Sequence, residues 1–329
     1  AVTTALVDRF SNKGTLPPLD PNQRIDGKTC LVTGASSGLG KAVAIQLAKR
    51  GGRLILACRK GHSSLVDDIH RASGNAAIEM LEVDLADLDS INHLCDQLRD
   101  RGTRIDIAVL NAGLMPLSAR KSPQGFELMF CVHFLANRLL LERWLNDGVI
   151  RTAQTGQAPA RVVFVASEAH QSSDPIDFSR FGAFTDYGMK DGMKHYGMSK
   201  LHLCTFATEL SRRVNSGQHT ALAVHALCPG PIASNIARES PAFIKPILWP
   251  IMKLMFRSPE QAAEPVVYLA CAPDMAQRSN VYLHMMREKT MSPLASNADN
   301  GRQLWEKSAA LLAPYLKPTR AESTTTQPA

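Results

Sequence analysis

The order of apolar and polar positions along the chain predicts a repeating unit of strand and helix. From about residue 29 to about residue 228, short continuous apolar runs alternate with longer stretches of helical periodicity. The predicted strands are 29–33, 53–58, 76–83, 105–110, 161–167 and 220–228, and the predicted helices are 39–50, 62–73, 87–100, 124–146 and 195–214. Strands without an alternating polar face are typical of a parallel sheet that helices cover on both faces. We therefore expect an α/β fold with a doubly wound parallel sheet and right-handed crossovers.

The predicted fold occupies one domain, residues 25–316, in which we find no repeat and no internal linker. Residues 1–24 are polar and contain three prolines that would break a long helix, so we interpret them as an N-terminal extension. Residues 317–329 are polar and lack apolar side chains for a core, so they are predicted to form a disordered tail.

One apolar segment does not follow the alternation. Residues 240–256, SPAFIKPILWPIMKLMF, are very apolar but are interrupted by Pro246 and Pro250. Three interpretations fit this composition: a helical flap packed on the core, a lid over an apolar substrate, and a surface that touches a membrane. We favour the helical substrate lid.

Composition and charge narrow the class of protein. Apolar residues make up 45% of the 329 residues and charged residues 20%, which is ordinary for a globular chain with a large core. The formal net charge is +7, but the basic residues are scattered and no run of five or more occurs. This pattern argues against a nucleic-acid partner and fits a solvated surface together with an anionic small-molecule cofactor.

Cysteine usage and hydropathy bear on the cellular compartment. The seven cysteines form no CxxC pair, and an odd number in a long chain argues against disulfides and zinc sites. We therefore predict buried free thiols, no metal site and a reducing, cytoplasmic compartment. No run of about 18 apolar residues occurs, so no transmembrane helix is predicted and any membrane contact would be peripheral.

A glycine-rich turn follows the first predicted strand and opens the first predicted helix. Residues 33–40 are TGASSGLG. Glycine lets the backbone turn tightly and lets a pyrophosphate approach, and the helix N-terminus supplies free N–H groups for its charge. This strand–turn–helix context predicts a dinucleotide site of the Rossmann type. Its predicted cofactor-binding residues are Gly34, Ser36, Ser37, Gly38, Leu39 and Gly40.

Residues at the ends of the second and third predicted strands complete the predicted nucleotide site. An NAD site usually carries Asp or Glu after the second strand for the ribose 2′-hydroxyl, whereas residues 57–60 are ACRK. Arg59 and Lys60 could hold a 2′-phosphate or could be solvated loop cations, and we predict NADP(H) with Arg59 as its main contact. Asp84 could meet the adenine or could cap the helix that follows, and we place it in the site with Leu85.

Five motifs in a fixed order give the chain a family resemblance. They are TGASSGLG at 33–40, NAG at 111–113 after the fourth strand, Ser167 at the end of the fifth, Tyr196-x-x-x-Lys200, and PG at 229–230 after the sixth. Over about residues 25–285 the chain resembles the short-chain dehydrogenase/reductase family. The resemblance implies an oxidoreductase that often forms dimers or tetramers. It adds to the predicted cofactor site Asn111, Ala112, Gly113, Tyr196, Lys200, Pro229, Gly230, Ile232 and Ser234.

Longer matches resemble the retinol dehydrogenase-like branch of this family. They are LACR at 56–59, ASEAH at 166–170, IDF at 176–178, YGMSKL at 196–201 and RQLWEKS at 302–308. The branch also has a long separation between the catalytic Ser and Tyr, which here is 29 residues.

The resemblance assigns catalysis to Ser167, Tyr196 and Lys200, and elementary chemistry supports this assignment. Carbonyl reduction needs a hydride, a proton, and a group that holds the oxygen as negative charge develops. The Tyr196 hydroxyl can give the proton, and Lys200, one helical turn later on the same face, is expected to lower its pKa. Ser167 is expected to hydrogen bond to the substrate oxygen. An ordinary amphipathic helix is the alternative for the spacing of Tyr196 and Lys200.

His133 departs from the family pattern. Within FCVHFLAN at 130–137 it occupies the position where the family usually places an Asn that helps to relay protons to the Lys. Three interpretations stay open: a catalytic proton relay through the imidazole, a residue packed under the site, and weakened redox chemistry. We favour the relay, which predicts an ionisation near the ordinary histidine pKa of about 6.5. Tyr187 does not compete with Tyr196, because Asp191 and not a Lys stands four residues after it.

The sequence therefore predicts an NADP(H)-dependent oxidoreductase that transfers a hydride between the nicotinamide and an apolar ketone, aldehyde or secondary alcohol. Tyr196 is the predicted general acid in the reductive direction. One alternative is a family member repurposed for a non-redox step such as cyclisation or isomerisation, for which the change at His133 leaves room. The other is a non-catalytic binding protein on the same fold, against which the intact Ser167, Tyr196 and Lys200 argue.

Overall fold

A computed structural model describes residues 15–215, 217, 219–232 and 257–316. The predicted lid at 240–256, the predicted cofactor residue Ser234 and the predicted tail at 317–329 lie outside the described residues. Within the described part of the chain, no helix is long and apolar enough to cross a membrane. All seven cysteines are described, and each is free and buried, as the sequence predicts.

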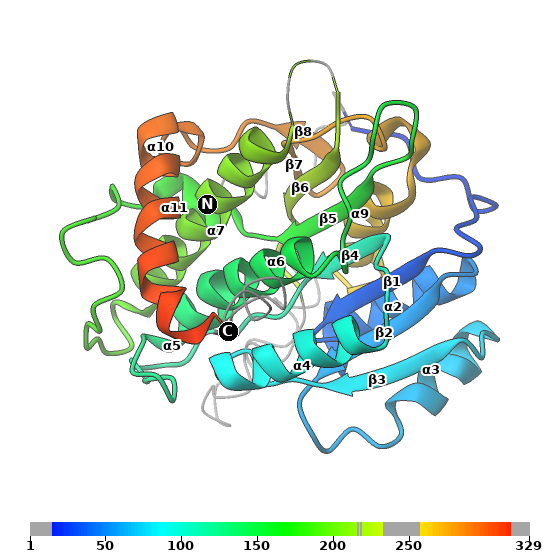
Figure 1. The fold of residues 1–329 in the computed structure, drawn as a ribbon, viewed down its shortest axis with the longest axis horizontal. Helices are drawn as coiled ribbons and strands as arrows, with labels where there is room; N and C mark the ends of the chain where they lie inside the picture. The colour runs from blue at the N-terminus through cyan, green and yellow to red at the C-terminus, as the bar shows by residue number, and fades with distance from the viewer. Residues whose placement is uncertain (1–14, 216, 218, 233–256, 317–329) are drawn as a thin grey trace, which may run out of the picture.

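One sheet forms the centre of the described structure (Figure 1). Its strand order is β3-β2-β1-β4-β5-β6-β7-β8, and all neighbouring pairs are parallel except the antiparallel pair of β7 and β8. The strands are β1 (Thr29–Thr33), β2 (Arg53–Cys58), β3 (Ile78–Glu82), β4 (Ile107–Leu110), β5 (Ala160–Val165), β6 (Leu222–Cys228), β7 (Val281–His284) and β8 (Arg287–Lys289). Strands are added outward from β1 to β3 on one side, and from β4 onward on the other side of β1. This switch in strand order between β1 and β4 is typical of a doubly wound Rossmann-type fold and confirms the predicted fold class.

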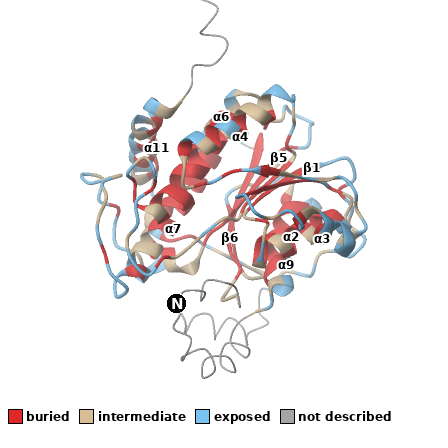
Figure 2. Cartoon of the chain, turned by 90° about the horizontal axis from the view of Figure 1, so that it is seen from below, coloured by how far each residue is buried: buried red, intermediate tan, exposed pale blue. Residues whose placement is uncertain are grey.

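Helices cover both faces of the sheet, and the two faces hold separate apolar cores (Figure 2). On one face lie α2 (Gly38–Lys49), α3 (Leu65–Ser73) and α9 (Pro259–Cys271). On the other face lie α4 (Leu88–Asp100), α5 (Leu128–Phe130), α6 (Ala136–Asn146), α7 (Gly192–Val214), α10 (Pro293–Ser296) and α11 (Ala298–Leu312). Because both faces are covered, the central strands carry apolar side chains in both directions, which explains their unbroken apolar runs.

The prediction that the regular series closes at residue 228 is wrong. The sheet continues into β7 and β8, which are only four and three residues long. Strands this short leave little hydrophobic periodicity to detect, and Asn280 and Met285 beside them adopt positive φ angles of 59° and 55°.

The helix predicted at 124–146 is also not continuous. It begins at Leu128, and residues Cys131–Leu135 form a π-helix before α6 begins. A π-helical insertion changes the direction of side chains along a helix and is frequent at functional sites. His133 lies at the centre of this insertion.

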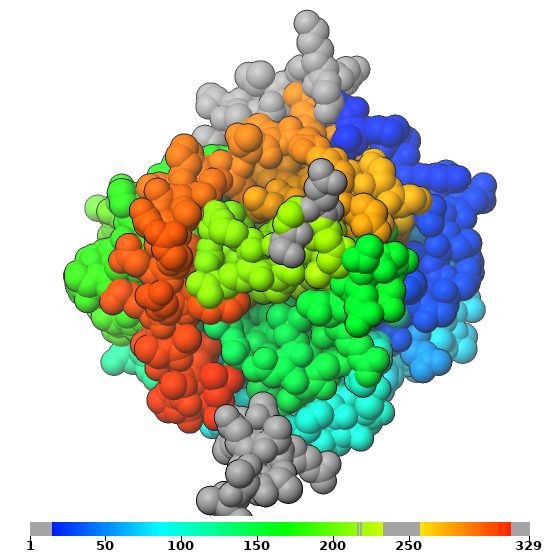
Figure 3. All heavy atoms as spheres, turned by 45° about the horizontal axis from the view of Figure 1, so that its top comes forward, coloured from blue at the N-terminus to red at the C-terminus, as the bar shows by residue number. Residues whose placement is uncertain are grey.

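The C-terminal helix α11 packs along α7, and Figure 3 shows α11 (orange to red) beside the yellow-green surface of α7. Trp305 contacts the guanidinium groups of Arg138 and Arg213, whose Cζ atoms are 4.0 Å and 4.5 Å from ring centroids of the indole. Cation–π contacts of this kind stabilise the packing of an aromatic ring against basic side chains. The RQLWEKS motif therefore has a structural role in holding α11 to α7.

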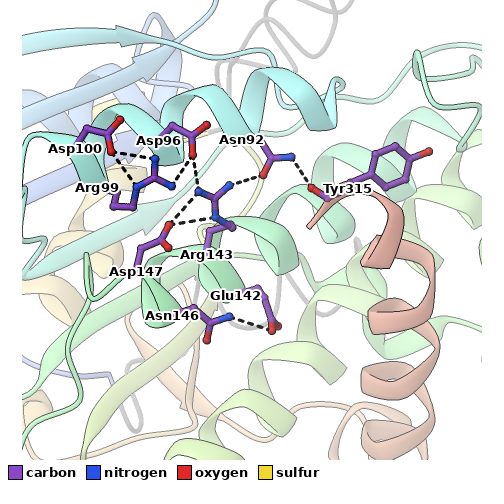
Figure 4. Close-up of polar contacts among 9 residues, drawn as sticks. All are labelled: Asn92, Asp96, Arg99, Asp100, Glu142, Arg143, Asn146, Asp147 and Tyr315. Atoms are coloured by element: carbon purple, nitrogen blue, oxygen red, sulfur yellow. Dashed lines mark hydrogen bonds and ion pairs between the residues drawn. The ribbon is translucent and has the colours of Figure 1, made fainter. Parts of the chain in front are cut away.

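A buried arginine joins α4 to α6 (Figure 4). Arg143 donates hydrogen bonds to Asn92 at 2.7 Å, to Asp96 at 2.7 Å and to Asp147 at 3.1 Å. The Asn92 amide in turn donates to the backbone carbonyl of Tyr315 at 2.8 Å, so the end of the described chain is attached to α4. A buried charge is tolerated when it is paired and fully hydrogen-bonded, and these contacts meet that requirement.

Candidate active site

The glycine-rich turn between β1 and α2 has a backbone that only glycine adopts easily. Gly34 and Gly38 have φ angles of +66° and +54°. A Cβ atom on Gly40 would lie 2.3 Å from the carbonyl oxygen of Gly34, so a side chain at this position would force the turn away from the helix. The predicted turn residues are thus brought together as one tight loop at the carboxyl edge of the sheet.

The NAG segment at 111–113 braces this turn from the neighbouring strand. The Asn111 amide nitrogen donates to the carbonyl of Thr33 at 2.9 Å, and the backbone N–H groups of Asn111 and Ala112 donate to the Thr33 hydroxyl at 3.0 Å and 3.1 Å. Thr33 is a residue that the sequence analysis did not assign to the site. The sequence does indicate a role for Thr33, because it is a polar residue at the end of an apolar strand.

The N-terminus of α2 fits a phosphate group. Its N-cap residue, Ser37, makes no side-chain capping hydrogen bond, and no acidic side chain lies in the first turn. Ser36 is half-buried and Ser37 is exposed, so the backbone of the turn is reachable from solvent. Free N–H groups and the positive end of the helix dipole suit an anion here. The turn therefore fits the pyrophosphate of a dinucleotide.

The predicted cofactor residues after β2 and β3 differ in their exposure and in whether they already have a partner within the protein. Arg59 is exposed and, among the described residues, has no ion-pair partner, whereas Lys60 pairs with Glu82 at 3.3 Å. Asp84 accepts the N–H of Ala86 at 2.9 Å and is exposed. The alternative in which Asp84 caps the next helix is wrong, because Asp87 is the N-cap residue of α4. Leu85 is buried.

The structure brings Ser167, Tyr196 and Lys200 together at the carboxyl ends of β4, β5 and β6. Ser167 follows β5 directly, and Tyr196 and Lys200 lie one turn apart near the start of α7. The Ser167 side chain lies near enough to the Tyr196 hydroxyl to lower the pKa of that hydroxyl. The Lys200 ammonium lies 5.7 Å from the centre of the Tyr196 ring and donates to the Val165 carbonyl at 3.0 Å.

Electrostatics at this site differ from the expectation for Tyr196. Burial raises the pKa of Tyr196 to about 12, although the nearby Ser167 side chain opposes this shift. The expected lowering by Lys200 is therefore not found, because its ammonium is turned to the Val165 carbonyl. Burial also lowers the pKa of Lys200 to about 8.

His133 is fully buried, and both of its ring nitrogens are occupied. Nε2 accepts the backbone N–H of Leu114 at 3.0 Å, and Nδ1 lies 2.8 Å from the Ser199 hydroxyl. That hydroxyl donates to the Tyr196 carbonyl at 2.7 Å, so it accepts from Nδ1, which must carry the proton. Burial, with the nearby Lys200 charge, holds the pKa of His133 well below its ordinary value.

The relay interpretation of His133 therefore needs correction. A group with so low a pKa does not give an ionisation near 6.5, and its Nε2 is engaged by a backbone donor. The neutral imidazole instead links the loop after β4, through Leu114, to Ser199 of α7. Ser199, which completes this tie, was missed by the sequence analysis, since nothing in its spacing indicates the contact.

The remaining predicted residues border the site. Pro229 is buried. Gly230 has a φ of +82°, and a Cβ atom on it would lie 3.1 Å from the Met285 side chain. Ile232 packs against the apolar core on the α2 face and pairs with Arg257 in an isolated bridge. Tyr187, by contrast, donates to the Glu127 carboxylate at 2.7 Å and is buried in the insertion before α7.

Comparisons with known proteins agree with this architecture. A family model described as short chain dehydrogenase matches residues 28–177. Retinol dehydrogenase 13 from Homo sapiens is 35% identical over 299 residues, which cover 88% of this chain and 85% of that protein. The chain therefore belongs to the short-chain dehydrogenase/reductase family of oxidoreductases. Within that family its similarity is to the retinol dehydrogenases.

Solved structures support the fold. An uncharacterised protein from Mycobacterium paratuberculosis has a TM-score of 0.68 at 23% identity, with 90% of this chain and 98% of that chain covered. The Pseudomonas aeruginosa RhlG/NADP active-site complex has a TM-score of 0.61 at 21% identity, covering 81% and 98% of the two chains. At these identities the likeness establishes the Rossmann-type fold.

The contacts of His133 lead to a prediction about its replacement. In His133→Leu the Leu114 N–H loses its acceptor, while the Ser199 hydroxyl still reaches the Tyr196 carbonyl. A buried donor left unsatisfied costs about 1–3 kcal/mol, so we expect the free energy of unfolding to fall by about that amount in urea titrations. If His133→Leu kept the wild-type stability and lost a pH-dependent step near pH 6.5, the relay interpretation would be supported instead.

The lowered pKa of Lys200 predicts a pH dependence. A lysine carries its charge below its pKa, so the ammonium is present below about pH 8 and is lost as the pH rises through that value. If the charge supports turnover, kcat should fall above about pH 8. In Lys200→Arg the guanidinium stays charged, and the remaining activity should not fall over this range. A wild-type rate that is flat up to pH 10 would contradict the prediction.

Proposed function

We propose that the chain is an NADP(H)-dependent oxidoreductase that transfers a hydride between the nicotinamide and an apolar ketone, aldehyde or secondary alcohol. The observation that carries this proposal is the grouping of the Tyr196 and Ser167 hydroxyl groups, with the Lys200 ammonium 5.7 Å from the Tyr196 ring. An acid and a hydrogen-bonding group side by side are what carbonyl reduction requires of the protein.

The cofactor would be held by the glycine-rich turn, the N-terminus of α2 and Arg59. The turn and the helix end fit the pyrophosphate, and Arg59, exposed and without an ion pair in the described structure, suits a 2′-phosphate. RhlG, one of the structural neighbours, is an NADP complex, which supports the choice of cofactor. When bound, the nicotinamide supplies the hydride.

The chain's own residues would handle the proton and the oxygen. Tyr196, with its pKa raised to about 12, is protonated at neutral pH and can donate its proton to the developing alkoxide. Ser167 can donate a hydrogen bond to the same oxygen. Lys200 holds α7 to the end of β5 through the Val165 carbonyl, which keeps Tyr196 beside Ser167.

An apolar substrate is supported by the surface next to the site. The exposed large apolar side chains of the described residues are Leu117, Met189 and Met193. Met193 lies one turn before Tyr196, and the segment around it approaches the loop of Leu117, since a Cβ on Gly192 would be 3.8 Å from the Pro116 carbonyl. A human relative is named for retinol, an apolar alcohol.

One assay distinguishes the proposed function from its two alternatives. We would follow cofactor absorbance with a panel of apolar aldehydes, ketones and secondary alcohols. Oxidation of NADPH with an aldehyde or ketone supports the proposal. Cofactor binding with conversion of a substrate but no change of cofactor oxidation state would favour a non-redox enzyme, and binding without any conversion would favour a binding protein.

The proton donor gives a direct prediction. Tyr196→Phe keeps the ring but removes the hydroxyl, so turnover should fall at least about 100-fold while the cofactor still binds. Tyr187→Phe is the matched control, because it removes a buried hydroxyl that binds Glu127 and not Ser167. The control should lose stability and keep its turnover. Near-normal turnover of Tyr196→Phe would assign the chemistry to another group.

The cofactor assignment gives a second prediction. Arg59→Ala should weaken NADPH binding by about 1.5–3 kcal/mol, which is roughly 10- to 150-fold, and should leave NADH binding unchanged. Arg53→Ala, at the opposite end of β2, is the control and should change neither affinity. Isothermal titration of both cofactors measures these affinities. A wild-type preference for NADH would show that the assignment is wrong.

A further inference from the structure

A second buried histidine lies beside the proposed catalytic serine. His170 belongs to the 3₁₀ helix Glu168–Ser172 that follows Ser167, and its side chain has no exposure to solvent. Its Nδ1 is 2.6 Å from the backbone carbonyl oxygen of Ser167. On the other side of the ring, Nε2 is 3.2 Å from the backbone nitrogen of Ser292.

These two contacts determine the protonation of the ring. A carbonyl oxygen only accepts hydrogen bonds, so Nδ1 of His170 must carry a proton. The N–H of Ser292 only donates, so Nε2 must be unprotonated. The imidazole is therefore neutral with one fixed tautomer, and burial lowers its pKa, which maintains this state.

The surroundings hold the ring in place. Ser292 is the N-cap residue of α10, its hydroxyl accepts the Ala295 N–H at 3.2 Å, and α10 packs on α7. The Tyr282 ring meets His170 edge-on at 5.1 Å, and its hydroxyl donates to Glu168 at 2.8 Å. The residues on the C-terminal side of the serine are thus anchored to two separate elements, α10 and β7.

We propose that His170 is a positioning residue for Ser167, holding the serine's peptide carbonyl so that its hydroxyl stays directed at Tyr196. The proposal rests on the proposed function. Ser167 is extended, with φ −160° and ψ 148°, and ψ is the angle that turns the carbonyl relative to the side chain. A bond to that carbonyl therefore restricts where Oγ can lie. Small displacements of catalytic groups reduce rates strongly.

The test is a double-mutant cycle with Ser167. His170→Phe keeps a ring of similar size but removes both hydrogen bonds, and kcat should fall by about 10- to 100-fold with unchanged affinity for NADPH. In a Ser167→Ala background the same change should reduce kcat less than about twofold, because the group being positioned is already gone. His170→Asn, whose amide can still donate to the Ser167 carbonyl, should recover part of kcat.

A control separates positioning from general loss of stability. His202 on α7 is also buried, and in the described structure its Nδ1 has no hydrogen-bond partner. His202→Phe should change kcat by the same factor with or without Ser167. If His170→Phe behaves in that additive way, the proposal is overturned.

A structural readout keeps this inference distinct from the proposed function. Crystal structures of the wild type and His170→Phe should show Ser167 Oγ moved away from the Tyr196 hydroxyl in the variant. Unmoved serine in the variant would overturn the positioning role, whether or not the wild type reduces carbonyls. Failure of the wild type with every substrate would instead overturn the proposed function alone.

Discussion

The hydrogen bond from the buried Lys200 ammonium to the Val165 carbonyl fixes the geometry on which the candidate active site depends. It attaches the first turns of α7 to the end of β5, and Ser167 lies two residues beyond that carbonyl. Burying a lysine is unfavourable for its charge, which is why its pKa falls to about 8. The attachment places the Tyr196 hydroxyl near the Ser167 side chain, which lowers the pKa of that hydroxyl.

Two neutral histidines reinforce this attachment in the same manner. His133 and His170 each donate from Nδ1 and accept a backbone N–H at Nε2, and both are excluded from solvent. A neutral imidazole can link a donor and an acceptor across a core without introducing a charge. One ring secures the backbone of Tyr196 through Ser199, and the other contacts the backbone of Ser167. The departure from the family pattern at His133 is therefore compatible with a well-ordered site.

The sequence predicted the parts of this protein that depend on local pattern. The central strands followed from the apolar runs, and the order of motifs at their carboxyl ends fits the rule that parallel strands end at one edge. The grouping of Ser167, Tyr196 and Lys200 was implied by the family resemblance. The strands β7 and β8 were not predicted because both are very short and their pairing depends on tertiary contacts. The pKa of Tyr196 also depends on where the Lys200 side chain turns, which spacing along a helix does not determine.

Direct transfer of a hydride is the central claim, and an isotope label tests it most simply. NADPH carrying deuterium at C4 of the nicotinamide would be incubated with the protein and an apolar aldehyde, and the alcohol would be analysed by mass spectrometry. We predict one deuterium on the carbinol carbon, with a single stereochemistry when only one face of the nicotinamide is labelled. Alcohol formed without deuterium from either labelled face, or substrate converted with the cofactor unoxidised, would contradict the account.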